Sequence, residues 1–229
     1  MPLSPVLSVG MVALALAMAG VFVFAAWCPE GTPRERTRWA LVALAAAVVY
    51  LGGSAALAAS GALSDVDARP PLAGLMLIGL SVGMIALAFS RFGDRLLAFP
   101  LAWLVGAQAF RILVEWWLSA AYGAGAVPAE VTWHGHNVDV VTGLLAVPLG
   151  LWLWRGSPPR WLIWAWNVLG LALLAVVVAT AALSLFGVVP TEPRVLLPTT
   201  FPGVWLPAWL VMLAFLGHLL VFRKLRQPT

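Results

Sequence analysis

The chain has 229 residues, of which 62% are hydrophobic and only 10% are charged, and its formal net charge is +4. A soluble domain carries about 25% charged residues, so too few charged side chains remain here to solvate a globular surface. The composition excludes an ordinary soluble protein and predicts a protein whose solvent is lipid. The basic residues stand in short clusters between long apolar runs, which is typical of membrane topology signals, so no nucleic acid is expected as a partner.

Seven apolar stretches are long enough to cross about 30 Å of hydrocarbon at about 1.5 Å per residue. They predict an all-α membrane protein, a single domain over residues 1–229 built as a bundle of seven transmembrane helices. The predicted helices cover approximately residues 5–27, 38–61, 70–90, 97–122, 138–155, 160–188 and 202–222. The connections between them are short and rich in turn residues, so no soluble domain is expected beside the bundle.

The basic residues also predict the orientation of the bundle. Only Arg69 and Arg194 fall in one set of alternate connections. The opposite set holds the ten residues Arg34, Arg36, Arg38, Arg91, Arg95, Arg155, Arg160, Arg223, Lys224 and Arg226. Because cytoplasmic loops carry the excess of Lys and Arg, the N-terminus is predicted outside and the C-terminus in the cytoplasm. Heavy use of Ala, Arg, Pro and Gly suggests a bacterial source, and thus a multi-pass protein of the inner (cytoplasmic) membrane.

The fourth predicted helix carries the strongest functional signal. Gln108, Arg111 and Glu115, here called the polar stripe, recur at i, i+3 and i+7, within about 60° of one another on the helix. A charged side chain at the centre of a membrane helix costs about 2.5–3.5 kcal/mol on insertion scales, so such residues face the bundle interior or a water-filled cavity. Two interpretations stay open: a functional pocket, or an Arg111–Glu115 ion pair that neutralises itself and holds neighbouring helices.

A second polar cluster, at residues 132–143, opens the fifth predicted helix at the outer interface. His134 and His136 could ligate a metal with Asp139 if this segment is extended, but their spacing is not diagnostic and no metal site is predicted. Alternatively, Asn137 is a helix N-cap, or Asp139 interacts with the helix dipole in the first turn. In a third interpretation, Asn137 and Asp139 join the polar stripe in one outward-opening pocket.

No cofactor is predicted, and two common membrane cofactors can be argued against. A retinal Schiff base needs a lysine near the middle of the last helix, whereas Lys224 lies at its cytoplasmic end. A bis-histidine haem needs two histidines at similar depth, whereas His134 and His136 lie outside and His218 in the cytoplasmic half. For His218 and for Asn167 in the sixth predicted helix, we expect hydrogen bonds across the bundle.

Three stretches of the C-terminal half are notable together. They are residues 110–116 (FRILVEW), 137–143 (NVDVVTG) and 201–207 (FPGVWLP), the last followed by His218. In combination they resemble a family of uncharacterised bacterial integral membrane proteins with seven helices. The resemblance covers the last four predicted helices and implies no established activity. The positions that it marks are Arg111, Glu115, Asn137, Asp139 and His218.

The sequence thus predicts a small-molecule-binding membrane protein, a transporter or a sensor, with an outward-facing polar pocket. The predicted ligand-binding residues are Gln108, Arg111, Glu115, Asn137 and Asp139. In this hypothesis Arg111 holds an anionic or carbonyl group by paired hydrogen bonds, and the ligand is small and amphipathic or anionic. Glu115 balances the charge or accepts a proton.

Two alternatives stay open beside the binding hypothesis. The first is a non-catalytic accessory subunit of a larger membrane complex, or a homo-oligomer, whose Ala- and Gly-rich first helices pack against a partner. The second is an intramembrane enzyme acting on a lipid or prenyl-type substrate, with Glu115, Asp139 or a histidine in acid–base roles. No catalytic residue is assigned, and binding is expected rather than catalysis. A subunit needs the polar stripe closed off, whereas an enzyme needs a portal from the lipid to two titratable groups.

Overall fold

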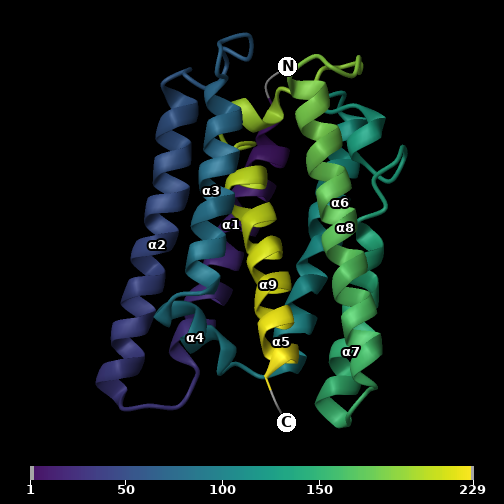
Figure 1. Ribbon diagram of the computed structural model, residues 1–229. Helices are drawn as coiled ribbons and strands as arrows, with labels where there is room; N and C mark the ends of the chain where they lie inside the picture. The colour runs from purple at the N-terminus through teal and green to yellow at the C-terminus, as the bar shows by residue number, and fades with distance from the viewer. Residues whose placement is uncertain (1–2, 228–229) are drawn as a thin grey trace.

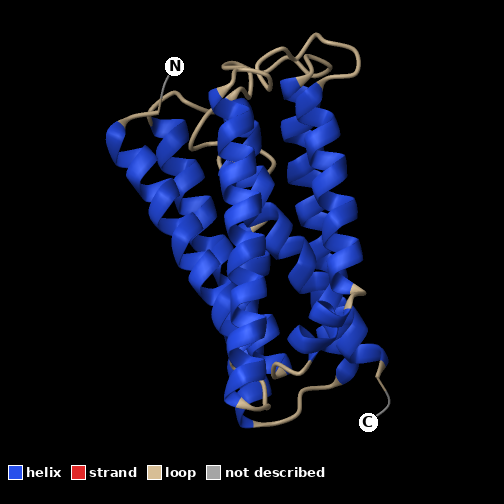
Figure 2. Ribbon diagram, turned by 90° about the vertical axis from the view of Figure 1, so that its left-hand side faces the viewer, coloured by secondary structure: helices blue, strands red, loops and turns tan. Residues whose placement is uncertain are grey.

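A computed structural model describes residues 3–227, and over this range the chain is helical and contains no strand. The helices lie side by side in one bundle, with the connecting loops gathered at its two ends (Figures 1 and 2). The described chain begins at one end of the bundle and finishes at the other (Figure 1).

The first two helices form a hairpin. Helix α1 (Pro5–Trp27) is capped by Ser4, whose hydroxyl accepts a hydrogen bond from a first-turn backbone N–H. Helix α2 (Pro33–Ala59) begins with a capping box, in which Thr32 and Glu35 satisfy each other's backbone N–H groups. This capping box explains why α2 starts five residues before the predicted boundary at residue 38, with its arginines inside the first turns.

The third predicted helix, residues 70–90, ends in a sharp bend. Helix α3 (Leu72–Ala88) is followed by the short helix α4 (Arg91–Leu97), and the two are bent by 67°. Ser90 causes the restart, because its hydroxyl accepts from the N–H groups of Phe92 and Gly93 in the first turn of α4. The segment that the sequence assigns to the connection between the third and fourth helices is thus itself helical.

The fourth span begins at Leu101 rather than at residue 97. Pro100 precedes it, and a proline disfavours helical backbone at the residue before it. The span consists of α5 (Leu101–Gly106), a 3-10 turn η1 (Ala107–Ala109) and α6 (Phe110–Gly123), which together form one apolar helix of 23 residues.

The last three helices complete the bundle. Helix α7 (Val140–Arg155) is followed by α8 (Arg160–Leu185). The final span starts as a π-helix, η4 (Leu206–Val211), and continues as α9 (Met212–Arg226), so it begins later than the predicted residue 202. Pro207 lies at the start of the π-helix, and its missing N–H is consistent with backbone that departs from α-helical winding there. Two further 3-10 turns lie in the connecting loops, η2 (Ala129–Val131) and η3 (Leu197–Thr199).

Five helices of the described range are long and apolar enough to cross a membrane, or six if α3 and α4 count as one bent span. Helix α7 has 16 residues, fewer than the roughly 20 of a typical span. Large apolar side chains cover the outside of the bundle, among them Val48, Val49, Ile78 and Val168, each more than half exposed. The protein is therefore a multi-pass helical membrane protein.

Helix α9 and its π-helical start occupy the middle of the bundle. Together they contact α1, α2, α3, α4, α5 and α8. Three buried tryptophans attach the first hairpin to α6 and to the start of the last span. They donate their indole N–H to backbone carbonyls at 2.9–3.1 Å: Trp117 to Leu7, Trp205 to Leu51 and Trp209 to Ala15. A buried indole needs such a partner, so these bonds fix how α1 and α2 sit against the rest.

Candidate functional site

A buried ion pair forms the centre of the candidate site. Arg111 lies near the start of α6 and Asp139 directly before α7, and they are 2% and 5% exposed. The Arg111 Nε donates to Asp139 Oδ2 at 2.7 Å, and its Nη2 donates to Asp139 Oδ1. Two parallel bonds of this kind make the strongest type of carboxylate contact. Arg111 therefore pairs with the residue before α7 and not with Glu115 on its own helix.

The other side of Arg111 faces α8 and α9. Its Nη1 bonds to His218 Nε2 at 2.8 Å, and its Nη2 also reaches the Gly170 carbonyl at 3.3 Å. Because a guanidinium only donates, His218 Nε2 must accept, and the ring proton sits on Nδ1. That proton is donated to Asn167 Oδ1 at 2.7 Å, and Asn167 returns a bond to the His218 carbonyl at 3.0 Å. His218 is thus a neutral imidazole held in one tautomer.

The hydrogen bonds predicted for Asn167 and His218 across the bundle are confirmed. The link from His218 to Arg111 was missed by sequence reasoning. One signal could have indicated it: a guanidinium has five donors, so a buried arginine needs more acceptors than one carboxylate supplies.

Glu115 lies one helical turn further along α6. Its Oε1 accepts from Asn137 Nδ2 at 2.7 Å, and the same amide donates to the Val131 carbonyl at 3.0 Å. The Asn137 side-chain oxygen accepts from the backbone N–H of Asp139 at 3.0 Å. Asn137 therefore folds the loop before α7 so that both carboxyl groups are held. The second oxygen, Glu115 Oε2, is buried and has no hydrogen-bond partner among the described residues.

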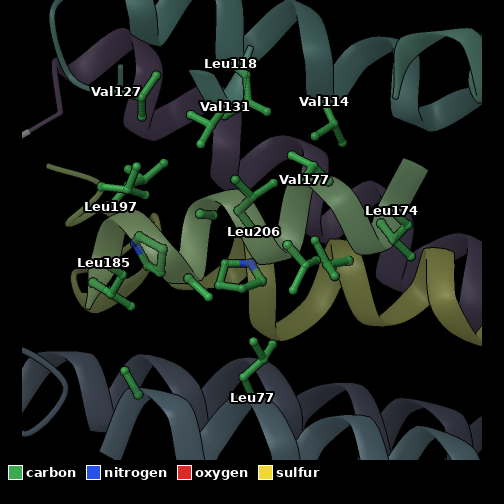
Figure 3. Close-up of a pocket in the computed structure, with 18 of the residues that line it drawn as sticks. Leu77, Val114, Leu118, Val127, Val131, Leu174, Val177, Leu185, Leu197 and Leu206 are labelled. Carbon is green, nitrogen blue, oxygen red and sulfur yellow. The ribbon is translucent and has the colours of Figure 1, made fainter. Parts of the chain in front are cut away.

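Beside this network lies an apolar cavity, here called the Glu115 cavity. Its lining comes from α3, α6, α8, the π-helix and the loops that carry η2 and η3, and it holds about 950 Å³ of space, part of it open to the surroundings. Figure 3 shows lining side chains of α3, α6 and α8, among them Leu77, Val114 and Val177, around a common space. Glu115 and Asp139 are the two polar residues of its lining, and every other lining residue is apolar.

The structure thus brings four of the five predicted binding residues together: Arg111, Glu115, Asn137 and Asp139. Arg111 itself lines neither the Glu115 cavity nor the cavity next to Gln108, since its guanidinium is occupied by protein acceptors. Its link to the cavity is indirect: it binds Asp139, and Asp139 lines the cavity.

Gln108, the fifth predicted residue, faces a different space. Its Nε2 donates to the Ala214 carbonyl at 3.2 Å, and its Oε1 has no partner in the described part of the chain. It lines a second apolar cavity bounded by α1, α4, α5 and α9, which together with the open space next to it holds about 580 Å³. Gln108 and Arg111 share one face of the helix, but different neighbouring helices pack against different parts of that face.

The two loop histidines are exposed and lie apart from the ion pair. His134 stacks on Tyr122 with ring centroids 4.9 Å apart, and its Nε2 bonds to Ser119 Oγ at 2.9 Å. Asp139, the third ligand of the metal alternative, is buried and engaged with Arg111. Between residues 3 and 227, no group of three His, Cys, Asp or Glu is placed to hold a metal ion.

Gly170 is a site residue that the sequence did not single out. A Cβ at this position would lie 2.5 Å from His218 Cε1 and 2.5 Å from Thr142 Cγ2. Only glycine lets α8 approach closely enough for its carbonyl to accept from Arg111.

No protein-family model, no curated protein and no solved structure matches this chain. The resemblance carried by residues 110–116, 137–143 and 201–207 therefore stays a prediction. The fold and the site together define a multi-pass helical membrane protein with a buried charged network beside an apolar cavity.

Proposed function

We propose that this protein binds a small amphipathic molecule in the Glu115 cavity, as a transporter or sensor of a bacterial inner membrane. The observation that carries the proposal is Glu115 Oε2, a buried oxygen without a partner at the wall of an otherwise apolar cavity. Leaving such an atom unsatisfied costs about 1–3 kcal/mol. A ligand with one hydrogen-bonding head group and an apolar body would remove that cost and fill the space.

The charges indicate which head group fits. Arg111 is balanced by Asp139, and the contact of Glu115 is the neutral amide of Asn137. An anionic head group would therefore meet an uncompensated carboxyl group. A hydroxyl suits Glu115 Oε2 whether that carboxyl is ionised or protonated, because a hydroxyl can both donate and accept. In this proposal Glu115 contacts the ligand, while Arg111 positions Asp139.

We further propose seven spans, with the N-terminus outside and the C-terminus in the cytoplasm. The bent α3–α4 pair and the short α7 would be the two spans beyond the five long helices. The described chain begins and finishes at opposite ends of the bundle (Figure 1), which supports an odd number of crossings. Basic residues of distant segments also gather at one end: Arg95 donates to the Pro29 and Glu30 carbonyls, and Lys224 to the Leu97 carbonyl.

The two alternatives fit the geometry less well. An accessory subunit needs no cavity at the polar network. An enzyme of the kind considered needs two free titratable groups, and both Asp139 oxygens are engaged by Arg111. Glu115 is left as the one cavity-lining carboxyl group with an oxygen that makes no hydrogen bond. A single such group suits ligand binding better than acid–base catalysis, which needs two.

The test compares wild type, Glu115→Met and Ala181→Phe after purification in mild detergent, with native mass spectrometry and thermal unfolding as readouts. Glu115→Met keeps the length of the side chain but removes both oxygens that could bond to a head group, and Ala181→Phe fills the cavity from α8. We expect the wild type to carry a bound molecule that both variants lose while they stay folded.

Glu130→Met is the matched control, because Glu130 lies on η2 near the site but does not line the cavity. This control should retain the bound molecule. A wild type without any bound molecule, together with Glu115→Met that unfolds at the wild-type temperature, would favour the accessory-subunit alternative.

A further inference from the structure

The Glu115 cavity continues into a groove on the outside of the bundle, here called the α3/α8 groove. Its walls are formed by α3 and α8 and its floor by Val211, Met212 and Phe215 of the last span. Four residues line both the groove and the cavity, which makes the two spaces neighbours: Leu77, Leu174, Val178 and Val211. Figure 1 shows α9 lying between α3 and α8, so these two helices stand apart along the groove.

The groove faces the region that lipid chains occupy. On its α3 wall, Ile78 and Val82 are 64% and 60% exposed, and both are apolar. Ser81 is the single polar residue of the lining, and its hydroxyl is already bonded to the Leu77 carbonyl at 2.8 Å. The groove therefore offers an apolar surface to a hydrocarbon chain and no polar partner of its own.

The loop end of the cavity is more closed. There its lining includes Val127, Val131 and Leu197, which are 1%, 4% and 7% exposed. A water-soluble ligand would have to displace these packed side chains, whereas a molecule already in the bilayer meets the open groove.

We infer that the α3/α8 groove is a lateral access path from the bilayer, and that the ligand is a single-chain amphiphile with a hydroxyl head group. This inference rests on the proposed function. Moving a chain from lipid into an apolar groove changes its surroundings little, because lipid tails are as apolar as the groove. Selection must then come from the head group. In hydrocarbon a hydroxyl lacks a hydrogen-bond partner, and Glu115 Oε2 at the end of the path supplies one.

The experiment uses the full chain in phosphatidylcholine vesicles that contain a small fraction of a diazirine-bearing hexadecanol. After irradiation, mass spectrometry maps which residues carry the label. We expect label on the groove residues of α3 and α8 and on cavity residues such as Val114 and Leu118. The corresponding diazirine-bearing hexadecane can neither donate to Glu115 nor accept from it, so it should label the groove but not the cavity.

Two tryptophan variants of α8 test the path itself. Ala175→Trp places a large ring in the groove, and Ala172→Trp places the same ring on an exposed position outside the groove and the cavities. Both positions face the outside, so both variants should fold, as checked by thermal unfolding. We expect Ala175→Trp to lower cavity labelling about tenfold and Ala172→Trp to leave it unchanged.

The outcomes separate this inference from the function on which it rests. Equal cavity labelling in Ala175→Trp and wild type would overturn the lateral path, while loss of labelling in Glu115→Met would still support the pocket. Label on the groove alone, identical for alcohol and alkane, would mean ordinary boundary lipid and would overturn the assigned ligand. Cavity labelling that is equally strong in Glu115→Met and wild type would contradict the proposed function itself.

Discussion

The first hairpin and the central helices are held in the bundle by different interactions. In the apolar windows of α1 and α2, 17% and 22% of residues are buried, against 44% for residues 101–123 and 56% for residues 206–226. The interior positions of the hairpin are apolar except for Ser54, whose hydroxyl bonds to its own helix. The buried charged residues of the described range all lie on α6 or directly before α7. The hairpin is thus held mainly by apolar packing, whereas the central helices depend on charge-assisted hydrogen bonds.

The largest effect is expected from cutting the ion pair. Arg111→Ala leaves Asp139 buried without its partner, and breaking such a pair from one side costs about 3–5 kcal/mol. We expect a strongly lowered unfolding temperature in detergent, or little folded protein at all. Arg34→Ala is the matched control in the hairpin, because this arginine is exposed at the start of α2, and such surface changes stay within about 0.5 kcal/mol.

A double variant shows whether the loss comes from the unpaired charge. Replacing both partners, as in Arg111→Met with Asp139→Leu, leaves neither charge buried alone, so it should recover part of the stability. If the double variant lost the full sum of the two single losses, Arg111 and Asp139 would not be energetically coupled. The central helices would then not depend on this ion pair for their stability, and the proposed difference from the hairpin would be wrong.

The buried polar residues of the central helices could be predicted from the sequence, but their hydrogen-bond partners could not. The spacing of Arg111 and Glu115 and the cluster at Asn137 and Asp139 indicated polar residues that had to face inward. Which acceptor Arg111 takes depends on where the loop before α7 folds, and nothing local to α6 determines that. The i,i+4 spacing even suggested Glu115, whereas Asn137 holds that carboxyl away from the ion pair.

The helical class of the fold followed from composition, while the irregular backbone did not. Long apolar runs made α1 and α8 predictable almost to their ends, whereas α2 starts five residues before its predicted boundary. The 3-10 turn at residues 107–109, the π-helix at residues 206–211 and the bend at Ser90 depend on local hydrogen bonds within apolar sequence. The Glu115 cavity was equally hidden, since a cavity is set by the distances between helices and not by their periodicity.

A smaller loss of stability is expected from a substitution where α8 contacts His218. Gly170→Ala would place its Cβ 2.5 Å from atoms of His218 and Thr142, so the neighbours must shift, and overpacking of this kind costs about 1–3 kcal/mol. Gly53→Ala is the matched change in the hairpin, where nothing lies within 4 Å of the added atom. Since alanine is favoured over glycine in a helix by about 1 kcal/mol, this control should be neutral or stabilising. Thermal unfolding of both variants checks the pair, and destabilisation by both would contradict the assigned difference.

The smallest effect is expected from the bond that attaches the hairpin to the centre. Trp209→Phe removes the indole N–H that donates to the Ala15 carbonyl at 3.1 Å, in a residue that is 1% exposed. A hydrogen bond of this kind contributes about 0.5–1.5 kcal/mol, so the unfolding temperature should fall slightly. Trp161→Phe, at a position 68% exposed, should change it less. Because α1 is held by packing and not by charge, hydrogen exchange should rise in α1 of Trp209→Phe and stay unchanged around Arg111. Faster exchange around Arg111 would instead mean that the hairpin and the Arg111 network are destabilised together.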